Sequence, residues 1–211
     1  MAIMGADITK SALIIVDMQN DFLNEAGHFG KLAKQYPERK IDMEFLGSTI
    51  PNVKRLAVAF RAAKRPVIYL AHIVKEDYSD AAFPYWRSPP PKKREFLVEG
   101  MWGAQITDEL KPQDGEHLVI KKGFGGFYNT HLDTVLRNLG VTTCVMCGVT
   151  TAVCVSTTTR EGVELNYRMI VVSDAVAERS KELHEAELRV LAMFTDVRTT
   201  DEVVKMLERE I

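Results

Sequence analysis

One cysteine in this chain stands where a nucleophile would be placed. Cys154 follows the apolar run of residues 141–147 and precedes a stretch with helical spacing, so we expect it in the first turn of a helix. A thiol there would face unpaired backbone N–H groups and the positive end of the helix dipole, which favour the thiolate. The position predicts a nucleophile, and the structural alternative is a core thiol.

Three further charged residues follow apolar runs in the same way. Asp17 ends one run, and Lys121 and Lys122 end another. A carboxylate can take the thiol proton, an ammonium group can stabilise the thiolate, and the thiolate can attack a carbonyl carbon. The structural alternatives are that Asp17 caps a helix and that the two lysines are surface charges. Since ligands bind at the carboxyl ends of parallel strands, we expect these groups to meet Cys154 there.

The elements that must position these residues are apolar runs alternating with helical patterns. We predict strands at residues 12–16, 66–71, 117–120, 141–147 and 168–172 and near residue 197, with helices at 52–64, 130–139, 181–194 and 200–210. Near-continuous Val/Ile runs joined by helices are typical of a parallel sheet covered on both faces. The sequence therefore predicts one α/β domain over residues 1–211. It would be doubly wound and Rossmann-like, with a mostly parallel six-stranded sheet and helices on both faces.

Two connections are longer than such a fold needs. They cover residues 24–47 and 72–115, and long connections in compact domains commonly form lids or oligomer contacts. Packing of the connection onto the body of the protein is the structural alternative. Much of the aromatic content lies in the second connection, at Tyr78, Phe83, Tyr85, Trp86 and Trp102.

Composition excludes several classes of protein. The 211 residues carry 27 Lys and Arg against 29 Asp and Glu, so we expect no nucleic acid and no membrane as a partner. No apolar run approaches the ~20 residues that span a bilayer, and the first residues do not resemble a signal peptide. Three cysteines make no disulfide framework, which favours a cytoplasmic location. Cys144 and Cys147 would point to opposite faces of a strand, so we predict that both are core residues.

Three ordered segments resemble the isochorismatase-like cysteine hydrolases. They are residues 13–22 (LIIVDMQNDF), 121–132 (KKGFGGFYNTHL) and 148–158 (GVTTAVCVSTT), and the resemblance extends from residue 12 to about residue 204. The third segment is most similar to the branch that contains ureidoacrylate, biuret and N-carbamoylsarcosine amidohydrolases.

The resemblance implies a role for each of the charged residues and for the thiol. Asp17 matches the general base of the family, whereas Asp21 does not. Lys121 has the spacing of the catalytic lysine, which makes Lys122 the weaker candidate. Cys154 matches the nucleophile.

The same resemblance implies the backbone geometry beside the nucleophile. A cis peptide bond is expected between Val149 and Thr150, and the backbone N–H groups of Thr150 and Cys154 would form the oxyanion hole. The predicted reaction is hydrolysis of a small amide or of a ureido or carbamoyl compound. It would proceed through a thioester-type intermediate on Cys154, with release of ammonia. The alternatives are a vinyl-ether hydrolase like isochorismatase itself and a non-catalytic binding protein on the same fold.

Further expectations concern the pocket, metals and assembly. Phe22 and Trp102 are predicted pocket walls, and His72 is either a pocket residue or a structural histidine. Residues 42–44 (DME) do not supply the Asp-x-His metal site of the nicotinamidases in this superfamily, so neither a metal nor another cofactor is expected. Family members are commonly oligomeric, which implies a homodimer or homotetramer.

Overall fold

The computed structural model describes residues 7–82 and 95–210. Its centre is a six-stranded sheet in the order β3-β2-β1-β4-β5-β6, in which each neighbouring pair is parallel. The strands are β1 (Ser11–Val16), β2 (Val67–His72), β3 (His117–Lys121), β4 (Thr143–Val149), β5 (Arg168–Ala177) and β6 (Asp196–Arg198). The predicted α/β doubly wound fold is confirmed, and the sheet is all-parallel.

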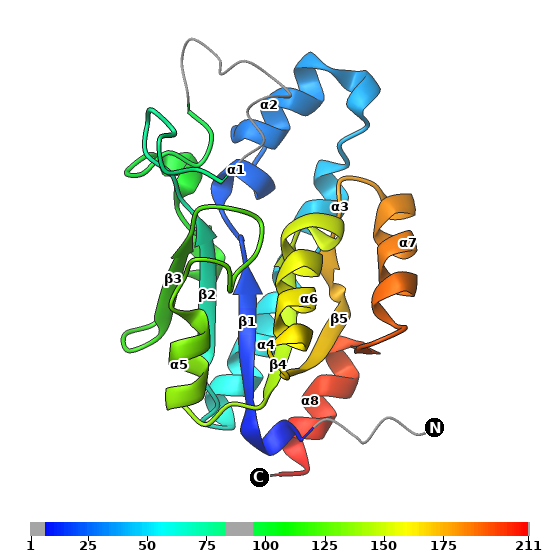
Figure 1. Cartoon of the computed structure of the whole chain (residues 1–211). Coiled ribbons are helices and arrows are strands. Elements are labelled where there is room, and N and C mark those ends of the chain that lie inside the picture. The colour runs from blue at the N-terminus through cyan, green and yellow to red at the C-terminus, as the bar shows by residue number, and fades with distance from the viewer. Residues whose placement is uncertain (1–6, 83–94, 211) are drawn as a thin grey trace.

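Helices cover both faces of the sheet (Figure 1). The helices are α1 (Asn20–Leu23), α2 (His28–Gln35), α3 (Met43–Gly47), α4 (Ile50–Ala62), α5 (Leu132–Asn138), α6 (Ser156–Glu164), α7 (Lys181–Leu191) and α8 (Thr200–Glu208). The apolar sides of α4 and α8 pack on one face of the sheet and those of α5 and α7 on the other. Every residue of the central strands β1 and β4 is buried, which explains their near-continuous apolar sequences.

The structure differs from the predicted elements in two informative places. β5 continues to Ala177, although Ser173 and Asp174 interrupt its apolar run. The Asp174 carboxylate accepts hydrogen bonds from the backbone N–H and hydroxyl of Thr200, so it is used at the start of α8. The longer β5 carries the chain to the same sheet edge as the ends of β1 and β4. The first long connection also forms two helices, α2 and α3.

The second long connection leaves β2 and returns at β3. Its described parts cover residues 73–82 and 95–116, and they are tied together by a bridge between Val74 and Val98. Phe83, Tyr85 and Trp86 lie outside the described residues. The buried Tyr78 donates a hydrogen bond from its hydroxyl to Phe96 O at 2.7 Å, which links the two described parts of the connection. Its side chain belongs to the hydrophobic core, so it also packs the connection onto the protein.

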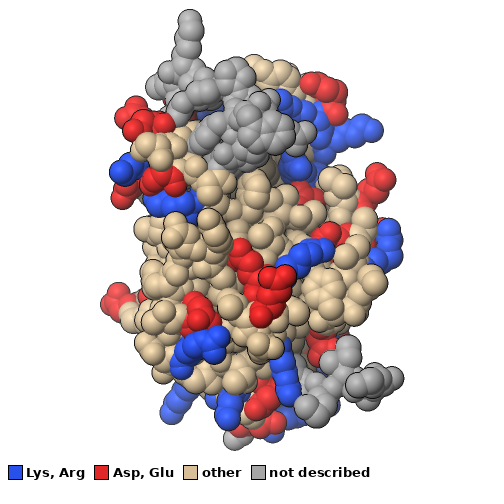
Figure 2. Space-filling view, viewed as in Figure 1, with Lys and Arg blue, Asp and Glu red and all other residues tan. Residues whose placement is uncertain are grey.

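The surface carries both signs of charge. Figure 2 shows acidic and basic side chains interspersed on the face over α5 and α6, without a continuous basic patch there. In the part of the chain that the structure describes, the helices are too short or too polar to cross a membrane. Cys144 and Cys147 lie buried in β4 as free thiols, which confirms them as core residues.

Candidate active site

Asp17, Lys121 and Cys154 meet at the carboxyl edge of the sheet. Asp17 follows β1, Lys121 ends β3, and Cys154 lies in the turn after β4. Lys121 Nζ is 2.8 Å from Asp17 Oδ2, and both side chains are fully buried. The Cys154 thiol lies close enough to both of them for their charges to act on its pKa. We refer to these three residues as the triad. Their meeting place is the β1–β4 junction, where strand order reverses in a doubly wound sheet.

The two adjacent lysines point in different directions. Lys121 turns inward and also donates from Nζ to Gly123 O at 2.9 Å. Lys122 is partly exposed and pairs with Asp80, at 2.7 Å between Nζ and Oδ2. Because successive side chains of a strand face opposite sides, only one of these two residues can join the triad.

Asp21 serves a structural contact. Its Oδ1 accepts the backbone N–H of His28 at 3.0 Å, and its Oδ2 accepts that of Leu97 at 2.8 Å. This carboxylate therefore joins the start of α2 to the second long connection. Of the two acids in this segment, only Asp17 lies beside the thiol.

Burial dominates the electrostatics of the triad. It raises the pKa of Asp17 more than the nearby ammonium of Lys121 lowers it. Burial alone would lower the pKa of Lys121, but the charges of Asp17 and Cys154 outweigh this effect, and the pKa lies above its ordinary value. The pKa of the Cys154 thiol is raised by burial, and Lys121 offsets only part of the rise. The resting sulfur therefore keeps its proton, and a base must remove it during any nucleophilic step.

The backbone around Cys154 differs from the helix end that the sequence predicted. Residues Thr151–Val155 form one π-helical turn before α6, so Cys154 is not in an ordinary first helical turn. The N–H of Ala152 donates to the buried carboxylate of Glu178 at 3.0 Å, and the N–H groups of Val153 and Val155 donate to Thr150 O. These N–H groups already have partners, which weakens the effect that the sequence predicted for the helix end.

The strand that leads into this turn is held close to β1. The Val149–Thr150 peptide bond is cis, as the resemblance implied. Gly148 has φ of +106°, and a Cβ there would lie 2.1 Å from Val16 O. Only glycine fits this position, because any other residue would collide with the backbone of β1. We call residues 150–155 the nucleophile turn.

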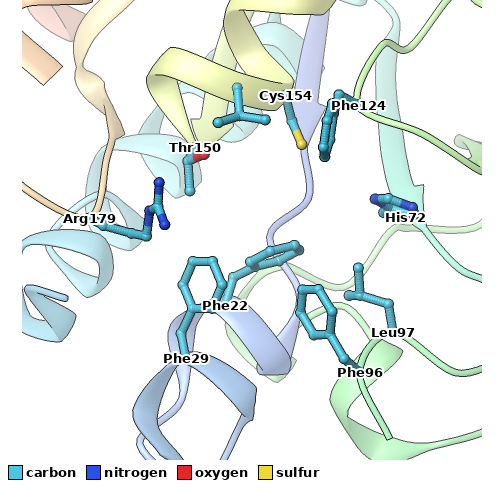
Figure 3. A pocket seen from close by; sticks show the side chains of 10 residues that line it. Phe22, Phe29, His72, Phe96, Leu97, Phe124, Thr150, Cys154 and Arg179 are labelled. Atoms are coloured by element: carbon cyan, nitrogen blue, oxygen red, sulfur yellow. The ribbon is translucent and has the colours of Figure 1, made fainter. Parts of the chain in front are cut away.

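A cavity of about 220 Å³ opens beside Cys154. Figure 3 shows the sulfur facing the cavity, with His72 and Phe124 on one side and Arg179 on the other. Thr150, from the predicted oxyanion hole, also contributes to its lining. The full lining consists of Phe22, Phe29, His72, Phe96, Leu97, Phe124, Thr150, Val153, Cys154 and Arg179.

The structure places one of the two predicted pocket walls at this cavity. Phe22 lines it, whereas Trp102 is 48% exposed and lines a neighbouring cavity with Asp21 and Lys31. His72 also lines the cavity beside Cys154, and it is buried at the end of β2, so its position agrees with both alternatives. Burial, with a smaller contribution from the charge of Lys121, lowers the pKa of His72 to about 3, so its ring is neutral.

Three phenylalanines from different segments form an aromatic wall, which we define as Phe22, Phe29 and Phe96. The ring centroids of Phe22 lie 5.0 Å from Phe29 and 5.5 Å from Phe96, both in edge-to-face contact. Asp21 ties together the segments that carry Phe29 and Phe96. The wall thus depends on contacts between residues far apart in the chain.

Sequence reasoning missed Phe29, Phe96, Phe124 and Arg179. The rings lie in connections whose course the sequence pattern does not fix. Arg179 had a usable signal, since it follows the carboxyl end of β5, but β5 was expected to end at residue 172. A prediction that β5 ends at Ala177 would have placed Arg179 at the same edge of the sheet as the triad.

The described residues offer no group of three or more His, Cys, Asp or Glu side chains that could hold a metal ion. Asp42, from the segment considered for a metal, instead begins α3, where its Oδ1 accepts the N–H of Phe45 at 2.8 Å. The chemical groups that the structure brings together at the site are a thiol, a carboxylate and an ammonium group.

Comparison with known proteins places these features in context. The model of the isochorismatase domain matches residues 11–202. The ureidoacrylate amidohydrolase RutB of Pseudomonas savastanoi pv. phaseolicola is 34% identical over 178 residues, which cover 79% of this chain and 70% of that protein. The protein of the same name from Agrobacterium fabrum is 34% identical over 179 residues, covering 79% and 75%.

Solved structures show the same architecture. A cysteine hydrolase from Pseudomonas syringae pv. phaseolicola superposes with a TM-score of 0.82 at 30% identity, covering 97% of this chain and 95% of that one. The N-carbamoylsarcosine amidase from Thermoplasma acidophilum gives a TM-score of 0.71 at 28% identity, covering 91% and 97%.

Proposed function

Because this chain belongs to the isochorismatase family of hydrolases, we propose that it is a cysteine-dependent amidohydrolase acting on a small ureido or carbamoyl compound. The observation that carries the proposal is the position of the Cys154 thiol, which lines a cavity and lies beside the buried Asp17–Lys121 pair. Relatives named as ureidoacrylate amidohydrolases support the class of substrate.

In the proposed first step, Asp17 takes the proton of Cys154 and the sulfur attacks the substrate carbonyl carbon. The backbone N–H groups of Thr150 and Cys154 stabilise the developing oxyanion, an effect worth about 3 kcal/mol per donor. Asp17 then returns the proton to the departing nitrogen, the C–N bond breaks, and a thioester or thiocarbamate remains on Cys154.

The second step restores the enzyme. Asp17 takes a proton from water, the resulting hydroxide attacks the acyl carbon, and the C–S bond breaks. The proton on Asp17 returns to the sulfur of Cys154, and the product acid leaves. Lys121 keeps its charge throughout, which stabilises the anionic forms of both neighbours.

The cavity suggests which substrates fit. Its apolar rings suit a short, flat molecule, and its volume of about 220 Å³ admits only a small one. Arg179 is the cation on the side opposite His72, where it would pair with an acid group of the substrate (Figure 3). We therefore propose a ureido acid, whose carbamoyl carbon reaches Cys154 while its carboxylate meets Arg179.

An ammonia-release screen tests this function. The substrates are ureidoacrylate, biuret, N-carbamoyl amino acids, nicotinamide and simple carboxamides. Isochorismate is the vinyl-ether comparison, and its turnover is followed by the release of pyruvate instead of ammonia. We expect release from ureido acids above the others, and loss of release in Asp17→Asn. Turnover of isochorismate alone would favour the vinyl-ether alternative, and no turnover of any compound would favour a binding protein.

A further inference from the structure

Glu178 is a fully buried carboxylate that the proposed reaction does not use. It directly follows β5, and both of its oxygens accept hydrogen bonds from N–H donors. Oε2 accepts the backbone N–H of Ala152 at 3.0 Å. Oε1 accepts the backbone N–H of Arg179 at 2.9 Å and its Nε–H at 3.1 Å.

These partners belong to two different parts of the site. Ala152 lies in the nucleophile turn, between Thr150 and Cys154. The guanidinium of Arg179 lines the cavity, and Figure 3 shows it beside Thr150. The buried carboxylate of Glu178 therefore connects the guanidinium of Arg179, which lines the cavity, with the nucleophile turn, which carries Cys154.

We propose that Glu178 is a positioning residue that holds Arg179 and the nucleophile turn in a single geometry. The inference rests on the proposed function, because Arg179 is there the partner of the substrate acid. The Arg179 side chain is 46% exposed, so without a fixed partner it would have many rotamers available. The carboxylate cannot easily release its donors, because a buried charge left unpaired is costly.

A second residue holds the same turn and provides a matched control. His184 is buried on α7, and its Nδ1 lies 3.0 Å from Thr151 Oγ1. Its ring stands edge-on to Phe45 at 5.1 Å. Glu178 and His184 thus support successive residues of the nucleophile turn, and Glu178 also accepts hydrogen bonds from Arg179.

Glu178→Gln removes the negative charge of the side chain and keeps its size. The amide keeps one oxygen acceptor, but its NH₂ group must face either Ala152 N–H or Arg179, both of which are donors. The first measurement is protection of Cys154 from iodoacetamide by 3-ureidopropionate. It needs no turnover and is compared with protection by the uncharged propylurea. We expect about tenfold weaker protection by 3-ureidopropionate in Glu178→Gln, and unchanged protection by propylurea.

Three further variants test whether Glu178 acts through Arg179. Arg179→Met should weaken protection by 3-ureidopropionate to a similar extent. In the double variant Glu178→Gln/Arg179→Met, protection should be no weaker than in Arg179→Met alone, because both substitutions act on the same contact. His184→Phe keeps an aromatic ring but loses the contact with Thr151, and should leave protection unchanged.

Steady-state kinetics give a second measurement. In ureidoacrylate hydrolysis, Arg179→Met should raise KM alone, whereas Glu178→Gln should raise KM and lower kcat.

Several results would overturn the inference, and they can be distinguished from one another. If 3-ureidopropionate fails to protect the wild-type protein, the proposed acid-bearing substrate is wrong and this inference fails with it. If it protects the wild type and Glu178→Gln equally, or if the two single effects simply add, only the positioning role of Glu178 is wrong. A lower Tm without any change in protection, KM or kcat would make Glu178 a structural residue only.

Discussion

The triad and the aromatic wall border the same cavity but are built in opposite ways. Asp17 directly follows β1, Lys121 ends β3, and Cys154 lies in the turn that joins β4 to α6, so the sheet positions all three residues. The aromatic wall comes from α1, α2 and the second long connection, held by ring contacts and by Asp21.

This difference predicts that the triad and the aromatic wall have separate roles in the site. The sheet edge positions the reacting groups and leaves little freedom, whereas the connections shape the space that a substrate must fill. Substitutions in the triad should therefore affect kcat, and substitutions in or behind the wall should affect KM. The following predictions test that division, beginning with the largest expected effect.

Cys154→Ala should lower turnover of the best substrate by about a thousandfold or more, because it removes the group that forms the covalent intermediate. Cys144→Ala is the matched control, since that thiol is buried in β4 away from the cavity. Steady-state ammonia release measures both variants, with circular dichroism to verify folding. Full turnover by Cys154→Ala would rule out the covalent mechanism.

Lys121→Met should lower turnover by about a hundredfold and Lys122→Met by only a few-fold, since one ammonium is in the triad and the other pairs with Asp80. The pH profile of alkylation by iodoacetamide measures the ionisation of Cys154 independently of turnover.

Because the pKa of Cys154 is raised, the rate of its alkylation should keep rising with pH beyond about 8.5, the ordinary thiol pKa.

Loss of the ammonium should move this alkylation profile to still higher pH, because Lys121 is the group that lowers the pKa of the thiol. A rate that levels off below the ordinary thiol pKa would show a preformed thiolate and contradict the role that we assign to burial.

Asp21→Asn should raise KM by about tenfold with little change in kcat. Asparagine has one acceptor oxygen, so its NH₂ group would face the N–H of either His28 or Leu97 and loosen the wall. We expect the free energy of unfolding to fall by about 1–3 kcal/mol. Substrate titrations and urea unfolding measure the two effects. A fall in kcat with unchanged KM would place Asp21 with the triad instead.

Phe22→Leu should raise KM by a few-fold, because it removes ring contacts on the cavity side of the wall. Trp102→Phe should have a smaller effect, since Trp102 lines the neighbouring cavity. KM values for the same substrate measure both variants. A larger effect at Trp102 would mean that the substrate extends beyond the cavity at Cys154.

The sequence by itself determined the architecture and the placement of the triad. Both follow from local patterns, because an apolar run marks a strand and the polar residue after it marks the edge where ligands bind. The sequence could therefore predict that Asp17, Lys121 and Cys154 meet at this edge, although choosing Lys121 over Lys122 also needed the family resemblance.

Only the tertiary structure decided the protonation of the thiol and the shape of the cavity. The pKa of Cys154 depends on burial among several elements, and Glu178 reaches the nucleophile turn from the residues that follow β5. The wall depends on a carboxylate that reaches Leu97, 76 residues further along the chain. Contacts of this kind have no local signature, because desolvation and long-range hydrogen bonds arise only when distant segments pack together.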